Sequence, residues 1–261
     1  MIKNIWILLF FFYSGSLLQA QEITAVDALN KASYQRMLTQ KMLNQYLKMG
    51  SNLDVANARK EMEASATRFE ELMIELLDFN PNEQVVKAIE DAQSAWRIYS
   101  LKVLSYPNKT MGTVLLKLSG KTLREYDDLL ILLEKQTNME EARLINLAGR
   151  QAMLAQRMEM LYLAQNWGLP EKEISKELKS MNEEFEETQS ALLAAEINMP
   201  QIVERLNSTL QSWRFLKGKF GNVPSPLAIL DMTNTMQEKL IETAGMYTEL
   251  TRQVDLSEED N

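Results

Sequence analysis

Apolar residues recur at every third or fourth position along most of this chain, which is the spacing of one face of an α-helix. Alternating apolar and polar runs bounded by turn residues, the pattern of strands, are hard to find. Residues with high helix propensity dominate the composition, and there are only 9 Gly and 6 Pro. The pattern predicts an all-α fold.

Turn signals divide the chain into eight helical segments. In the first half the breaks are MGSN at 49–52, FNPN at 79–82 and SYPN at 105–108. In the second half they are NWGLP at 166–170, NMP at 198–200 and GNVPSP at 221–226. Long helices joined by short loops are typical of antiparallel four-helix bundles, so we predict two such bundles in tandem.

The two halves are copies of one unit. At a shift of 116 residues, 9 of the 19 positions between Leu29 and Leu47 are identical in the second copy. The clearest match is ASYQRMLTQKM at 32–42 against AGRQAMLAQRM at 148–158. One more residue of shift aligns Trp96 with Trp213, and we expect both rings to pack in the cores. A repeat of this length indicates a duplicated structural unit.

The repeat and the breaks define the expected segments: a signal peptide at 1–20, bundles at 21–136 and 137–254, and an acidic disordered tail at 255–261. No Pro occurs between Met111 and Trp167. This leaves open one long continuous helix across the join, which would stack the bundles end to end. The two copies of the motif would then lie far apart, and pairing them would require a homodimer.

The N-terminus has the pattern of a secretory signal peptide. Lys3 precedes an apolar run from Ile5 to Tyr13, and small and polar residues follow up to Ala20, the expected cleavage site. Cleavage removes one lysine and changes the net charge from −8 to −9. We expect a periplasmic protein; the alternative is an uncleaved segment that anchors the chain to the inner membrane.

The composition excludes several kinds of chemistry. The chain has no Cys and no His, so it has no thiol nucleophile, histidine base, disulfide or histidine metal ligand. No acidic loop with the glycine of a calcium site is present, and we expect no metal and no cofactor. No catalytic constellation of other residues stands out, so we predict that it is not an enzyme. An acidic chain without a basic block is also a poor nucleic-acid binder.

Both copies of the motif are basic and free of acids. The first contains Lys31, Arg36, Lys41 and Lys48, and the second contains Arg143, Arg150 and Arg157. The ordinary explanation is ion pairing with acidic second helices such as RFEELMIE at 68–75. Arg36 and Gln40 differ, because they lie in the middle of a stripe that is apolar at both ends. A guanidinium buried there needs a partner, and a planar anion such as carboxylate, nitrate or phosphate would fit its fork.

These two motifs resemble the opening helix, or P box, of a bacterial sensor-domain family. The family comprises the N-terminal domains of type IV pilus methyl-accepting chemotaxis transducers (PilJ-like) and of nitrate/nitrite sensors (NarX- and NarQ-like). The resemblance implies a four-helix sensor bundle in which the arginine before the methionine binds an anion. That arginine is Arg36 in copy one, and copy two has Ala152 there. The later basic position is Lys41 or Arg157, and Arg150 is a further candidate in copy two.

The leading hypothesis is a non-enzymatic periplasmic sensory protein that binds a small anion, nitrate-like or carboxylate. The candidate ligands are Arg36, Gln40, Lys41, Arg150 and Arg157. The signal would pass to a membrane-bound receptor, kinase or pilus component. Ala152 favours the alternative, a helical scaffold with a degenerate ligand site that docks on such a partner.

Overall fold

The computed structural model describes residues 23–137, 139–219 and 226–259, and within them every regular element is an α-helix. The prediction of an all-α fold is confirmed. The expected signal peptide and the break at 221–226 lie largely or wholly outside the described residues. The helices are α1 (Ala25–Gly50), α2 (Val55–Leu77), α3 (Glu83–Val103), α4 (Lys109–Thr137), α5 (Glu140–Asn166), α6 (Glu171–Leu193), α7 (Pro200–Lys219) and α8 (Pro226–Glu259).

The other five predicted breaks fall at or beside the ends of helices. The reason is visible at two of them. Asn52 and Asp54 adopt left-handed backbone conformations between α1 and α2, and Gly168 does so after α5, with φ of 74°. At the C-terminus the helix is longer than expected, because α8 continues to Glu259 whereas a disordered tail was predicted from residue 255.

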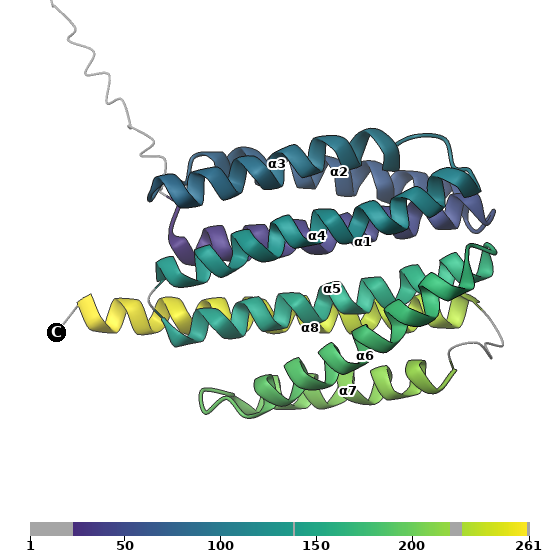
Figure 1. The fold of residues 1–261 in the computed structure, drawn as a ribbon. Helices are drawn as coiled ribbons and strands as arrows, with labels where there is room; N and C mark the ends of the chain where they lie inside the picture. Colours follow the sequence, from purple (N-terminus) through teal and green to yellow (C-terminus); the bar gives the residue numbers. More distant parts are fainter. Residues whose placement is uncertain (1–22, 138, 220–225, 260–261) are drawn as a thin grey trace, which may run out of the picture.

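The two halves lie side by side and are not stacked end to end (Figure 1). Helix α4 ends at Thr137 and α5 begins at Glu140, so no continuous helix crosses the join. In the first half α1 packs on α2 and α4, and in the second α5 packs on α6 and α8. Helices α1 and α5 also pack closely on each other, so the buried residues of both halves form one hydrophobic core. The pairing of the two motif helices is thus made within one chain.

Residues related by the repeat make the same contacts. The amide of Gln35 donates to the carbonyl of Phe69 at 3.0 Å, and that of Gln151 donates to the carbonyl of Phe185 at 3.1 Å. The Phe69 ring stacks on Trp96 with centroids 3.7 Å apart, and its counterpart Phe185 stacks on Trp213 at 3.9 Å. Both tryptophans are buried, as expected. The duplication in the sequence therefore corresponds to a duplicated packing pattern.

Helices α1 and α5 approach most closely where Ser33 of one meets Gly149 of the other, and these two positions are equivalent in the repeat. A Cβ added at Gly149 would lie 1.7 Å from the Oγ of Ser33 and 3.0 Å from its Cβ. The first contact is too short to exist and the second is tighter than most, so a side chain at Gly149 would force Ser33 to rotate and the two helices to shift. The glycine is what allows the two motif helices to pack together.

A second close contact fixes the far ends of the same helices. Trp167, just after α5, packs on the backbone of Gly50 and Gly112, where an added Cβ would lie within 2.3 and 2.8 Å of the indole. The indole also meets the ring of Tyr46 edge to face, with centroids 6.1 Å apart. Helices α1, α4 and α5 are therefore joined at one end of the molecule.

Among the described helices, none carries the sustained apolar run that crossing a bilayer requires.

The contact between Ser33 and Gly149 predicts a specific coupling. Gly149→Ala should lower the free energy of unfolding by about 1–3 kcal/mol, because the new methyl group overpacks the α1–α5 contact. Gly245→Ala in α8 is the matched control, because Gly245 is also a helical glycine and a Cβ added there would meet nothing within 4 Å. Ser33→Gly should rescue Gly149→Ala in a double-mutant cycle followed by urea denaturation. Independent effects of the two changes would contradict this account.

Candidate functional site

Arg36 is completely buried where α1, α4 and α5 meet. Its Nη1 donates to the Oδ1 of Asp127, on α4, at 2.7 Å, and its Nη2 donates to the carbonyl of Asn146, on α5, at 3.2 Å. Burial lowers the pKa of Arg36, and the negative charge of Asp127 opposes that shift. The buried guanidinium thus has an internal carboxylate as its partner.

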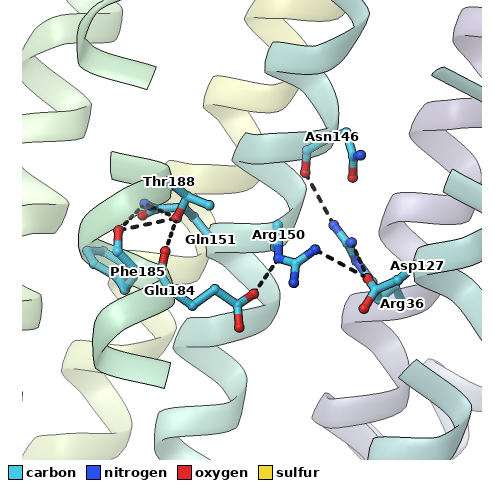
Figure 2. Close-up of polar contacts among 8 residues, drawn as sticks. All are labelled: Arg36, Asp127, Asn146, Arg150, Gln151, Glu184, Phe185 and Thr188. Atoms are coloured by element: carbon cyan, nitrogen blue, oxygen red, sulfur yellow. Dashed lines mark hydrogen bonds and ion pairs between the residues drawn. The ribbon is translucent and has the colours of Figure 1, made fainter. Parts of the chain in front are cut away.

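Asp127 is the centre of a row of alternating charges that leads to the surface (Figure 2). Its Oδ1 also lies 3.9 Å from Nη1 of Arg150, and the Nε of Arg150 pairs with Glu184 on α6. Burial lowers the pKa of Arg150, but the charges of Glu184 and Asp127 outweigh it and leave that pKa above its ordinary value. The row therefore links α1, α4, α5 and α6 by electrostatics.

The five predicted ligand residues do not converge on one point. Gln40 is buried, and the only hydrogen bond of its amide within the described residues is a 3.3 Å contact to Thr39. Lys41 lies on another side of α1 and pairs with Glu61 of α2 at 2.9 Å. Only Arg150 and Arg157 face a common cavity. Lys31, expected to pair with an acidic second helix, does so with Glu75.

A further set of buried polar contacts between α1 and α5 was missed by the sequence analysis. The Nδ2 of Asn44 donates to the Oε1 of Gln156 at 2.7 Å, and Lys48 pairs with the buried Glu159 at 2.7 Å. Thr233 of α8 donates to the same carboxylate at 3.1 Å. The sequence does contain a signal for these contacts, because the polar residues Gln40, Asn44 and Lys48 follow one another at every fourth position of α1.

The cavity that Arg150 and Arg157 share is a groove of about 560 Å³ between α4 and α6, with α5 as its floor. We call it the α4–α6 groove. Helix α6 packs less closely on α5 than α2 does on α1, which opens the groove. Its apolar lining includes Leu116, Leu123, Met153, Leu161, Ile174 and Met181, and its charged lining comprises Lys117, Arg124, Asp127, Arg150, Arg157, Glu177 and Glu184.

Arg157 is the most deeply buried cation of this groove, with 7% of its surface exposed. One nitrogen, Nη2, pairs with Glu177 on α6. The other, Nη1, is buried and has no hydrogen-bond partner within the described residues. A buried donor left unpaired is costly. Because the Arg157 side chain lines the groove, a rotation of its guanidinium would bring this donor to an acceptor bound there.

The repeat produces an equivalent but different groove beside α1. It has a volume of about 270 Å³ and lies where α1 and α5 meet α2 and α8. Ile241 and Ala244 stand where the α4–α6 groove has Arg124 and Asp127, and Tyr34 stands where it has Arg150. The groove beside α1 is also lined by Lys31 and Arg68, but the charges of Arg124, Asp127 and Arg150 are found only in the α4–α6 groove of this pair.

Two guanidinium groups above apolar side chains form an arrangement that can bind an anion. Within the described residues, no group of three carboxylates is placed to hold a metal ion. Burial raises the pKa values of Tyr99, Tyr126 and Tyr247, so these three side chains remain neutral hydroxyls at ordinary pH. Comparison of the chain with protein-family models, curated proteins and solved structures finds no match in any of the three.

The pair of Arg36 and Asp127 predicts an asymmetric stability effect. Asp127→Asn should lower the free energy of unfolding by about 3 kcal/mol, because it leaves a fully buried guanidinium without a carboxylate. The neighbouring exposed carboxylate provides the control Asp128→Asn, which should have little effect. Arg36→Met should cost less than Asp127→Asn, since Asp127 keeps Arg150 nearby and is 25% exposed.

Adding Arg36→Met to Asp127→Asn should recover stability, because the uncompensated charge is then gone. Urea denaturation of the four variants measures these differences. Equal effects of Asp127→Asn and Asp128→Asn would show that the ion pair does not stabilise the fold.

Proposed function

We propose that this protein is a non-enzymatic periplasmic sensory module that binds a small organic anion in the α4–α6 groove. The observation that supports the proposal most strongly is Arg157, which lines a cavity of ligand size and has a buried Nη1 without a hydrogen-bond partner among the described residues. Arg150 provides a second cation seven residues away, on the same face of α5. The binding helix is thus the second copy of the basic motif.

The lining of the groove favours a carboxylate that carries an apolar group. A guanidinium nitrogen donates well to a carboxylate oxygen, and the pair gains from low local dielectric. Nitrate could make the same contact, but it would leave the Leu, Ile and Met side chains that line the groove exposed to water. Burial of an apolar chain on that floor adds affinity in proportion to the area covered.

Arg36, the residue that matches the family's anion-binding arginine, has a different role in this proposal. It is completely buried and already bonded to Asp127, and it does not line the groove. It acts on the ligand site indirectly, because Asp127 lies between it and Arg150. An anion beside Arg150 would weaken the attraction of Asp127 to that arginine and alter the row of charges that joins α1 to α6. Such a change could then pass to a membrane-bound partner.

Binding should depend on Arg157. Calorimetry of residues 21–261 should show that hexanoate binds more tightly than acetate, nitrate or nitrite, because only hexanoate covers the apolar floor. Arg157→Gln should weaken hexanoate binding by about tenfold or more, the effect of losing one charge-assisted hydrogen bond. Glu177→Gln should strengthen it, because that change removes the carboxylate that competes for Arg157.

Arg143→Gln is the matched control, since Arg143 lies on the same helix, is exposed and does not line the groove. It should leave affinity unchanged, and circular dichroism should show that all variants remain folded. The proposal fails if no anion gives a binding isotherm, or if Arg157→Gln and Arg143→Gln behave alike.

A further inference from the structure

One stretch of this acidic chain contains cations alone. Between Asp91 and Glu125 there is no carboxylate, although the whole chain has a net charge of −8. The stretch covers the second half of α3, the turn after it and the first half of α4. Its basic residues are Arg97, Lys102, Lys109, Lys117, Lys121 and Arg124.

The fold makes this stretch one continuous surface. Helices α3 and α4 are neighbours, and Asp91 and Glu125 line the same shallow groove between them. Everything on the turn side of those two acids is therefore free of negative charge on both helices. We call this end of the two helices, at the right in Figure 1, the α3–α4 corner.

The cations of the α3–α4 corner are not used by the fold. None of the six forms an ion pair with any described residue. Cations without an ion pair also occur elsewhere, Arg59, Lys60 and Arg143 among them, but there carboxylates lie close by in the sequence. The corner differs because no carboxylate is interspersed among its cations. Unpaired cations gathered at one end produce a local positive potential in a negative molecule.

The same corner exposes large apolar side chains. Leu101 is 80% exposed and Tyr106 85%, and Ile98, Leu104 and Val114 are each at least 41% exposed. Leu101, Leu104 and Tyr106 lie at the end of α3 and in the turn, so they protrude from the molecule beside Lys102 and Lys109. Exposed apolar residues gathered in this way mark an interaction site.

We propose that the α3–α4 corner binds the surface of an anionic phospholipid bilayer. Protruding Leu and Tyr side chains among unpaired lysines suit a lipid interface, where the apolar groups enter between headgroups and the cations remain at the phosphate level. Each such lysine adds to the attraction of an anionic surface. The rest of the chain is acidic and is repelled by it, so the molecule docks by this corner only.

The opposite end of the molecule supports this assignment by contrast. Ile74 and Leu77, near the end of α2, are also exposed. Their neighbours in sequence are acidic, namely Glu70, Glu71, Glu75 and Asp78. An anionic membrane would repel that end, so exposure of apolar residues alone does not create a second docking point. Lys117 and Arg124 belong both to this stretch and to the lining of the α4–α6 groove, whereas Lys102 and Lys109 do not line that groove, so the docking test on Lys102 and Lys109 does not depend on the ligand proposed there.

Co-sedimentation with vesicles tests the proposal. Residues 21–261, which contain every described helix, should bind vesicles of equal parts phosphatidylglycerol and phosphatidylcholine, and binding should weaken as salt is raised. Vesicles of phosphatidylcholine alone should bind little. Leu101→Ser/Tyr106→Ser and, separately, Lys102→Gln/Lys109→Gln should each weaken binding by about tenfold or more.

Two control variants carry the same kinds of substitution at the opposite end of the molecule. Ile74→Ser/Leu77→Ser removes apolar groups that are 66% and 45% exposed, and Lys135→Gln/Arg143→Gln removes two exposed cations that form no ion pair with a described residue. Both should bind vesicles like the parent chain. Failure to bind anionic vesicles, or loss that is equal in corner and control variants, would overturn the proposal. So would capture of a periplasmic protein that depends on the corner while vesicles are ignored, because the corner would then be a protein interface.

Discussion

The guanidinium of Arg36, held out of water between three helices, constrains much of the structure around it. A charge in that position requires a carboxylate, and α4 provides it in Asp127. It also requires an acceptor for its second nitrogen, which is the backbone of α5 at Asn146. The backbone can come so close because Gly149 has no side chain. Ala152, at the equivalent position of α5, brings no second charge into the same core.

The local features of the fold could be predicted from the sequence. Apolar spacing and turn residues placed the helices, and the repeat predicted a duplicated unit, in which Gln35 and Gln151 make equivalent contacts. The lateral packing of α1 on α5 could not be predicted in this way. The absence of Pro near the join permits a continuous helix but does not require one. The chain turns between α4 and α5 instead, and this turn lets the polar stripes of α1 and α5 be buried against each other.

The candidate site was predicted only in part, for a related reason. Arg36 was expected to need an anion, but its partner is 91 positions away in sequence, where no local pattern marks it. Arg157 was a candidate because it matches the later basic position of the family motif, and Arg150 because the motif's arginine is replaced by Ala152. The groove they line depends on how far α6 lies from α5, which is a property of packing and not of either helix alone. Asn44 and Glu159 were missed because their contacts cross the two halves, and Lys48, expected to pair with an acidic second helix, pairs with Glu159 of α5 for the same reason.

The contact between Ser33 and Gly149 also bears on how the two copies can have diverged after duplication. If the first half packed on a second copy of itself in the same way, Ser33 would meet Ser33 in a space that holds no second side chain. Lys48 would also lose Glu159, whose counterpart in the first half is Leu43. The two halves are therefore complementary: each can pack on the other in this way, but neither can pack in the same way on a second copy of itself. One half expressed alone would thus lack the partner on which its motif helix packs. Only the other half, linked covalently or added in solution, would restore that contact.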